Sequence, residues 1–255
     1  MTEREYRAAE GINKSTLWEM RKSPAHYKYL LEHPAEDTPA LRFGRALHAA
    51  VLTPRIYKRD FVIAPAVDRR TKAGKEAYAE WRASLPDEAE EITAEDAETV
   101  AEMVACVKAN QDAMTLLKGT KKETPIFWTD KTAGLRCKCR LDAWGKDWVV
   151  DLKTTADMMN FERDAYNYGY HVQAAHYLRG AEAKTGRLPK WYFIAIEKKP
   201  PYGIRVIEAD PGFIDYGEYI RQELLEKVRA CRESGEWPCY SAGKITEPRW
   251  ADWGE

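Results

Sequence analysis

The sequence has no long apolar run, and its cysteines form no recognisable binding pattern. No stretch approaches the roughly 18 consecutive apolar residues of a membrane span, and the first residues, MTEREYRAAEG, lack the apolar segment of a secretory signal. We therefore expect a cytoplasmic protein that has no membrane partner. The five cysteines are an odd number without CxxC spacing, which predicts reduced structural thiols rather than a disulfide framework or a zinc ribbon.

The sequence also lacks an excess of positive charge. It has 40 Lys and Arg against 41 Asp and Glu, a formal net charge of −1. Coating a nucleic acid through bulk charge requires many cations that face phosphate, so any such contact must depend on local clusters. Three clusters occur: Arg69, Arg70, Lys72 and Lys75 in DRRTKAGK; Lys118, Lys121 and Lys122 in KGTKK; Arg136, Lys138 and Arg140 in RCKCR. Each can equally be a solvated face.

The N-terminal third is predicted to be helical. Ser23 and Pro24 supply an N-cap and a first-turn proline for a helix through PAHYKYLLEH. A second helix covers PALRFGRALHAAVL, and five of its residues share one face that is expected to point toward the core: Leu41, Gly44, His48, Val51 and Leu52. The segment from about Asp60 to Pro86 is rich in charge, which predicts an exposed loop or short helix that could move and reach a nucleic acid.

The middle of the chain predicts one long helix and then three strands. Thr93, with Asp96 three residues later, resembles a capping box, and apolar residues at helical spacing continue to Gly119. The pattern then alternates in ETPIFWT, LRCKCRLDAW and WVVDLKTT, which are separated by turns at DKTAG and GKD. Alternation with short turns predicts a three-stranded meander.

The C-terminal part predicts a helix, two strands and a final helix. A helix through HVQAAHYLRGAEAKTG ends at Gly186, and KWYFIAIE and GIRVIEA read as strands. A last helix begins at Asp210 and Pro211, and its apolar side should lie on the sheet: Phe213, Tyr216, Ile220, Leu224, Val228 and Cys231. This order predicts one α/β or α+β domain over residues 1–255, with a helical part and flap (1–90), a core (91–234) and an irregular tail (235–255).

Charged residues interrupt two strands that otherwise read as buried. Because side chains alternate across a strand, Asp142 shares a face with Lys138 and Arg140, and Asp151 shares a face with Lys153. Burying such groups is costly unless they pair with each other or with a cation. A divalent cation would satisfy this need, because Mg²⁺ prefers carboxylate oxygens and a short turn brings Asp142 and Asp151 side by side. Lys153 could then orient or deprotonate a water and stabilise charge on a phosphate.

The same residues also fit roles that involve no metal ion. The D-x-K doublet is common, so Asp151 and Lys153 can form a structural ion pair while Asp142 stabilises a turn. Two carboxylates also occur in glycosidases, although a lysine on the same face suits phosphate better than sugar. By its spacing alone, His48 can be a core histidine whose hydrogen bonds are satisfied within the fold.

These residues lie in sequence blocks that resemble a known group of nucleases. The blocks are SPAHYKYLLEH, LRFGRALHAAVL, DRRTKAGK, GLRCKCRLDAW, VVDLKTT and HVQAAHYLRG, in this order, over about residues 13 to 180. They resemble the phage and prophage exonucleases of the RecE (exodeoxyribonuclease VIII) group, within the PD-(D/E)xK nuclease superfamily. Val150 stands where the superfamily's name has proline. The resemblance implies a restriction-endonuclease-like fold, in which helices flank a mixed central sheet.

The resemblance also implies a metal centre and its ligands. The ion would be Mg²⁺, for which Mn²⁺ substitutes. The implied ligands are the side chains of His48, Asp142 and Asp151 and the backbone carbonyl of Leu152, and Lys153 is implied to be catalytic together with the two aspartates.

Further residues are assigned by the same resemblance. Gln173 and Tyr177 form a QxxxY element with a catalytic role, and their spacing of four also places them on one helix face, where ordinary packing is the alternative. Glu123, at the start of the first strand, is an additional acidic candidate near the metal. No iron–sulfur cluster is expected, because Cys231 and Cys239 alone cannot supply four ligands.

The predicted function is that of a Mg²⁺-dependent exodeoxyribonuclease. By resemblance, it digests linear double-stranded DNA from 5′ to 3′ and leaves single strands for an annealing protein that acts in recombination. A homo-oligomeric ring around the DNA would explain how a nearly neutral chain stays attached. The basic residues of DRRTKAGK and RCKCR are predicted to contact DNA. The alternatives are an endonuclease with the same core, or a non-catalytic DNA-binding or assembly protein.

Overall fold

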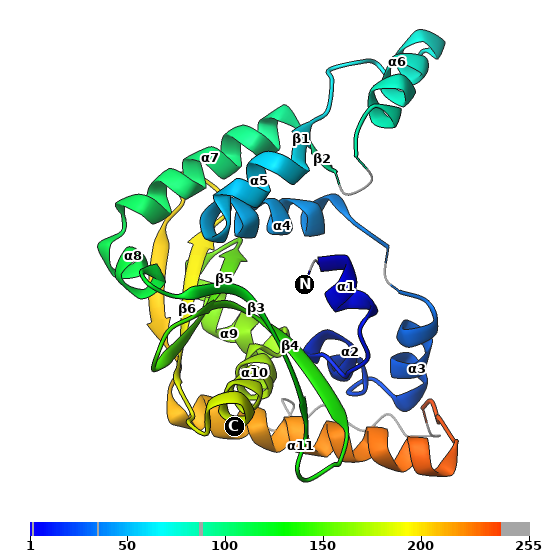
Figure 1. Ribbon diagram of the computed structural model, residues 1–255, viewed down its shortest axis with the longest axis vertical. Coiled ribbons are helices and arrows are strands. Elements are labelled where there is room, and N and C mark those ends of the chain that lie inside the picture. Colours follow the sequence, from blue (N-terminus) through cyan, green and yellow to red (C-terminus); the bar gives the residue numbers. More distant parts are fainter. Residues whose placement is uncertain (2, 35, 87–88, 241–255) are drawn as a thin grey trace, which may run out of the picture.

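The centre of the protein is a five-stranded mixed sheet with the strand order β3-β4-β5-β6-β7 (Figure 1). The structure is a computed structural model, and it describes residues 1, 3–34, 36–86 and 89–240. The strands are β3 (Lys121–Thr129), β4 (Arg136–Trp144), β5 (Trp148–Thr155), β6 (Lys190–Glu197) and β7 (Ile204–Glu208). Strands β5 and β6 are parallel, and the other neighbours are antiparallel. The predicted meander and the predicted fold class, a mixed sheet flanked by helices, are confirmed.

Helices cover both faces of this sheet. The N-terminal ones are α1 (Glu3–Ala8), α2 (Lys14–Glu19), α3 (Pro24–Glu32), α4 (Pro39–Leu52), α5 (Pro54–Asp60) and α6 (Lys72–Ala83). They are followed by α7 (Ala94–Ala109), α8 (Gln111–Leu117), α9 (Phe161–Asn167), α10 (Tyr170–Thr185) and α11 (Pro211–Ser234), and a 3₁₀ turn, η1 (Met158–Asn160), precedes α9. Figure 1 shows α4 and α7 on one side of the sheet and α10, with α11 beyond it, on the other.

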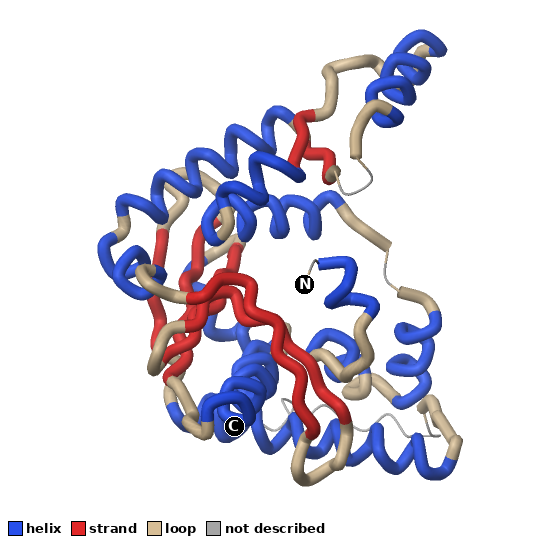
Figure 2. Tube along the Cα trace, viewed as in Figure 1, coloured by secondary structure: helices blue, strands red, loops and turns tan. Residues whose placement is uncertain are grey.

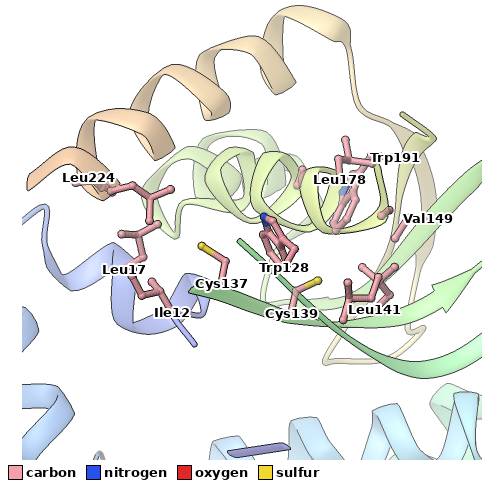
Figure 3. Packing of buried hydrophobic residues seen from close by; sticks show 14 of the residues in the cluster. Ile12, Leu17, Trp128, Cys137, Cys139, Leu141, Val149, Leu178, Trp191 and Leu224 are labelled. Atoms are coloured by element: carbon pink, nitrogen blue, oxygen red, sulfur yellow. The ribbon is translucent and has the colours of Figure 1, made fainter. Parts of the chain in front are cut away.

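The core on the α10 side joins the sheet to the N-terminal helices. Figure 3 shows Cys139 and Leu141 of β4 and Trp191 of β6 packed beneath α10, with Leu17 of α2 beside Leu224 of α11. Leu17 is completely buried. Burying one such side chain contributes roughly 1.5–3 kcal/mol, so α2 is held firmly against the sheet and its neighbouring helices.

The final helix packs on α10 rather than on the sheet, which corrects the prediction. The two helices come closest at Gly217, where an added Cβ would lie 2.1 Å from the carbonyl oxygen of His171. The buried face includes Arg221 and Leu224, whereas Tyr216 is half exposed. Periodicity identified an apolar side of this helix but not the layer that covers it, because several surfaces can bury the same stripe.

Two predictions on the opposite face of the sheet are also wrong. Helix α4 buries Leu47 and Ala50, whereas Leu41, which was expected on the core face, is half exposed. The single helix predicted up to Gly119 is in fact two helices, because Asn110 ends α7 and its side chain accepts the Ala113 N–H to begin α8.

The charged segment after α5 forms a protruding flap. Helix α6 stands away from the rest of the protein (Figure 1), and β1 (Phe61–Ile63) pairs in parallel with β2 (Glu90–Ile92) at its base. In the predicted tail, residues 235–240 contain neither helix nor strand, and 241–255 lie outside the described residues. Within the described part of the chain, no helix combines the length and apolar character needed to cross a membrane.

Candidate active site

Strands β4 and β5 form a fork at Asp142. The two strands pair only at Ala143–Val150 and Trp144–Val149, and the β3–β4 hairpin then bends away from the other strands (Figure 2). The Leu152 N–H, which would bond to β4 in a continued ladder, instead donates to Oδ2 of Asp142 at 2.9 Å. Because the N–H and C=O of one residue point to the same edge of a strand, the Leu152 carbonyl also faces the fork.

Three potential metal ligands meet at this fork. Nδ1 of His48, from α4, lies 3.4 Å from Oδ2 of Asp142. One ligand atom each from His48, Glu123 and Asp142 lies within 4.8 Å of the other two. The pairs Lys122–Ala143 and Thr124–Leu141 of β3 and β4 flank Glu123 and Asp142, so these two residues face each other across the hairpin. Like charges that face each other destabilise a sheet. An imidazole nitrogen and two carboxylates are a donor set that fits a divalent cation, which would also neutralise this repulsion.

Glu123 is constrained by both its charge and its backbone. Burial raises the pKa of Glu123 to about 8, and the charges of Asp142 and Asp151 add to the increase. The guanidinium of Arg140 forms an ion pair with this carboxylate, with Nε 2.8 Å from Oε2 of Glu123. The backbone φ of Glu123 is +47°, in the left-handed region that residues other than glycine seldom adopt. Such backbone outliers cluster at functional sites, so Glu123 is a stronger candidate than its position in the sequence indicated.

Asp151 and Lys153 lie beside this cluster on β5. Nζ of Lys153 lies 2.5 Å from Oδ2 of Asp151, and only 3% of the Asp151 side chain is exposed. Gln173, from α10, donates its Nε2–H to Oδ1 of Asp151 at 2.5 Å. Burial raises the pKa of Asp151 to about 6; Lys153 opposes the shift and Asp142 adds to it. The carboxyl groups of Asp142 and Asp151 are therefore close enough to influence each other.

A second lysine and a tyrosine ring lie near Lys153. Nζ of Lys153 lies 4.7 Å from the ring centroid of Tyr170. Burial lowers the pKa of Lys153, but Asp151 and Asp142 raise it more, so the net shift is upward. Lys14, from α2, donates to the Tyr168 carbonyl at 2.5 Å. Burial lowers the pKa of Lys14 to about 7, an effect that Lys153 reinforces and Asp151 opposes.

The sequence alone does not predict Lys14 or Tyr170 as site residues. Lys14 begins a six-residue helix whose spacing carries no chemical pattern. It reaches the site because α2 docks through Leu17, which is a tertiary contact. Tyr170 is three residues before Gln173 and therefore lies on the same face of α10, which is the one signal that points to it.

The two residues of the QxxxY element have different surroundings. Gln173 holds Asp151 directly through its amide. Tyr177, one turn later, packs edge-on against Trp191 with ring centroids 5.9 Å apart. Burial raises the pKa of Tyr177 well above its usual value, and Tyr6, Asp151 and Asp142 are among the groups that add to the shift. The structure therefore brings Gln173 to the site and places Tyr177 in the core next to it.

The basic residues of the flap are separate from the metal-ligand cluster. The Arg69 guanidinium lies 3.9 Å from the ring centroid of Tyr78, and Arg70 pairs with the aspartate two residues before it. Lys72 and Lys75 are exposed in the first turn of α6. Because α6 projects from the rest of the protein, a nucleic acid bound at the fork would have to extend beyond it to reach these basic residues (Figure 1).

The three basic residues of β4 have three different environments. Lys138 is buried, and its ammonium donates to three carbonyl groups at the end of α1, those of Tyr6, Arg7 and Ala9. This placement contradicts the prediction that Lys138 contacts DNA, because the ammonium satisfies helix-terminal carbonyls. Arg140 pairs with Glu123 within the site. Arg136 is exposed, with its guanidinium 5.8 Å from the ring centroid of Phe127.

Comparison with solved structures shows which fold the chain shares. A crystal structure from Eubacterium rectale, of a protein described as "Putative exonuclease", matches 100% of this chain and 98% of its own chain, with a TM-score of 0.68 and 14% identity. At this identity the likeness shows the fold alone. A structure described as SSO0001 matches 83% of this chain and 85% of its own at 14% identity, but its TM-score of 0.31 carries no argument. Comparison with curated proteins finds no match.

Comparison with protein families identifies the chain. Residues 14–248 match the model described as "PDDEXK-like domain of unknown function (DUF3799)". The match extends from the first residue of α2 past the end of α11, and so it includes every residue of the fork. It confirms the predicted superfamily, although the RecE group is a finer assignment than the match makes. The chain belongs to the PDDEXK-like family DUF3799, within the superfamily of PD-(D/E)xK nucleases.

Proposed function

We propose that this protein is a divalent-metal-dependent exodeoxyribonuclease that acts on linear double-stranded DNA. One observation carries the proposal: His48, Glu123 and Asp142 meet at the β4–β5 fork, with the Asp151–Lys153 pair beside them. The PDDEXK-like family supports a nuclease. The Eubacterium rectale protein that is described as "Putative exonuclease" shares the fold over the whole chain, and its description supports action at DNA ends.

The proposed ion is Mg²⁺, with Mn²⁺ as a substitute. His48, Glu123 and Asp142 would hold it, and the resemblance to the RecE group adds Asp151 and the Leu152 carbonyl. When bound, such an ion supplies Lewis acidity, which activates water as a nucleophile and neutralises charge on the phosphoryl oxygens.

The protein's own side chains would bind and orient the phosphodiester. The Lys153 ammonium, positioned between Asp151 and Tyr170, can donate to a phosphoryl oxygen as negative charge develops on it. Gln173 fixes one oxygen of Asp151 and leaves the other directed at Lys153. Because the side chains of Asp151 and Lys153 are only 3% and 15% exposed, these interactions are stronger than they would be in water.

Polarity and partners are proposed from the resemblance to the RecE group. The protein would digest one strand from 5′ to 3′, form a homo-oligomeric ring around DNA and deliver single strands to an annealing protein that acts in recombination. The net charge of −1 supports a ring, because enclosure retains DNA without a strongly basic surface. The flap cations and the exposed Arg136 are the proposed contacts to the DNA backbone.

End-labelled linear duplexes, incubated with and without Mg²⁺, test this proposal. We expect mononucleotides to be released first from a 5′ label, only with Mg²⁺, while closed circular DNA stays intact. Asp151→Ala should abolish release but retain the fold and much of the DNA binding. The matched control is Asp147→Ala, because Asp147 is exposed in the β4–β5 turn and pairs only loosely with Arg187 at 3.4 Å.

Two outcomes would overturn the proposal in different ways. Cleavage of closed circular DNA would assign an endonuclease with the same core. Wild-type protein that releases no nucleotide with either Mg²⁺ or Mn²⁺, yet binds DNA, would assign a non-catalytic binding or assembly protein.

A further inference from the structure

Several exposed tyrosines lie on the elements next to Tyr170, the ring that contacts the proposed catalytic lysine. Tyr166 of α9, Tyr168 just after it and Tyr216 of α11 are 48%, 58% and 50% exposed. A single exposed aromatic ring needs no special cause, but a group of them marks a binding surface. Together with the more buried Tyr170, these residues form a surface that we call the tyrosine strip.

The rings of the strip form two groups, and the inner group reaches Lys153. The ring of Tyr168 lies 5.9 Å from that of Tyr170, and the face of Tyr170 lies against the Lys153 ammonium. Farther out, the rings of Tyr166 and Tyr216 are 6.3 Å apart. The imidazole of His171 packs against both, at 5.4 and 5.2 Å.

Helix α2 holds the middle of the strip in place. Gly169 has a φ of +68° and lies so close to Trp18 that an added Cβ would be 2.7 Å from the indole. Lys14 donates to the carbonyl of Tyr168, and the Trp18 ring lies 5.7 Å from that of His171. Because α2 is anchored by the buried Leu17, the exposed rings are mounted on a fixed support.

Basic side chains flank the strip, and the acidic side chains of α9 next to it are paired. The Arg21 guanidinium and the Lys14 ammonium lie 4.5 and 5.3 Å from the Trp18 ring centroid, and Arg21 is exposed. The acidic side chains of α9 form the pairs Glu162–Arg205 at 3.4 Å and Asp164–Arg163 at 3.8 Å. A negatively charged ligand therefore meets the Arg21 cation and, on α9, carboxylates that are paired with arginines.

We propose that the tyrosine strip binds a single-stranded segment of the DNA strand whose phosphodiester reaches Lys153. This inference rests on the proposed nuclease function. Every base has a flat face that stacks on an aromatic ring, so tyrosines bind unpaired nucleotides regardless of sequence, and nearby arginines and lysines bind the phosphates. Tyrosines also suit protein interfaces, but Tyr168 contacts Tyr170, whose face lies against Lys153, and this favours the substrate.

Fluorescence anisotropy of a labelled thymidine oligonucleotide in EDTA tests the strip. Without divalent ions the strand is not hydrolysed, so binding is measured independently of nuclease activity. Tyr166→Ala and Tyr168→Ala should each weaken binding about 5-fold or more, the usual effect of losing one stacked base. Tyr168→Phe should retain most of the affinity, because the ring rather than the hydroxyl carries the contact. The matched control is Tyr29→Ala, since Tyr29 is 63% exposed on α3.

Salt dependence separates stacking from charge. The slope of log affinity against log salt should be unchanged in Tyr168→Ala and smaller in Arg21→Ala, because phosphate contacts alone release counterions. Affinity in Tyr166→Ala and Tyr168→Ala equal to that of wild type would overturn the inference. Conversion of an oligomer to monomers by Tyr216→Ala in light scattering would also overturn it and assign the strip to a second copy of the chain. Loss of binding in the tyrosine variants, with no nuclease activity in wild type, would retain the strip and reject the nuclease.

Discussion

Replacing Asp142 with asparagine should stabilise the metal-free protein and remove its response to metal. Carboxylate oxygens of Asp142 and Glu123 lie within 4.8 Å, and above the Glu123 pKa of about 8 both groups are charged. At this separation Coulomb's law gives about 3.5 kcal/mol of repulsion for an effective dielectric constant of about 20. The ion pair between Glu123 and Arg140 reduces this value. Asparagine keeps an acceptor oxygen for the Leu152 N–H, so we expect the free energy of unfolding to rise by about 1–2 kcal/mol.

Thermal unfolding in EDTA and in Mg²⁺ or Mn²⁺ measures both effects. In EDTA at pH 9, where Glu123 is charged, Asp142→Asn should melt about 2–8 °C above wild type, the shift expected from this free energy in a chain of this size. An ion that binds only the native state at 100-fold excess over its Kd stabilises it by about 2.7 kcal/mol, and wild type should show such a rise whereas the variant should not. Asp147→Asn, at an exposed position, should behave as wild type in both buffers. A variant that is destabilised in EDTA, or that responds to Mg²⁺ as wild type does, would refute the reasoning.

Three further predictions follow from contacts in and around the site. Gln173→Leu removes the hydrogen-bond donor that fixes Asp151. The initial rate of hydrolysis of end-labelled duplex should fall about 10- to 100-fold, which is the usual cost of losing a residue that orients a metal ligand. An unchanged rate would contradict this role. In wild type the Arg221 guanidinium is 1% exposed and lies 2.8 Å from Asp130, so Asp130→Ala removes one of its carboxylate partners. Urea unfolding should show that the free energy of unfolding falls by about 3 kcal/mol. A change near zero would exclude a stabilising pair. Burial lowers the pKa of His176 from 6.5 to about 3, so the stability that its neutral form provides is complete above pH 6.5 and declines below it. Between pH 7 and 5, the free energy of unfolding of wild type should therefore fall more steeply than that of His176→Gln. Parallel curves of unfolding free energy against pH would rule this out.

The parts of the site that lie on β4 and β5 are predictable from the sequence. Alternation along a strand is a property of covalent geometry, so the shared face of Asp151 and Lys153 needs no tertiary information. The same holds for the helix that begins at Ser23, because an N-cap and a first-turn proline act within a few residues. Local geometry likewise predicted the meander that brings Asp142 next to β5.

The remaining parts of the site depend on contacts between distant segments. Glu123 is opposite Asp142 only because of the β3–β4 register, and the fork opens only because the hairpin leaves β5. Lys14 reaches the site through the docking of α2. Lys138 alternates as predicted, but whether a strand face is covered by a helix or by solvent depends on where α1 packs, and here α1 buries it.

Helix packing likewise cannot be predicted from local sequence patterns alone. In α4 and α11, periodicity predicted a helix and an apolar side, but the buried stripe is rotated from the predicted one in both. In α11 the cause is the layer order: the helix covers α10 at Gly217, where two backbones approach closely. The break between α7 and α8 at Asn110, in contrast, has a cause that is visible in the sequence. A polar N-cap residue inside an apolar pattern starts a new helix even though the apolar periodicity continues.

The central claim is that the β4–β5 fork binds a divalent cation. Crystals grown with Mn²⁺ and measured near its absorption edge locate such an ion directly by anomalous scattering. We predict one strong peak at about 2.0–2.3 Å from a carboxylate oxygen of Asp142, with His48, Glu123 or Asp151 completing the protein ligands. Fully occupied Mn²⁺ elsewhere, with the fork free of anomalous signal, would contradict this claim.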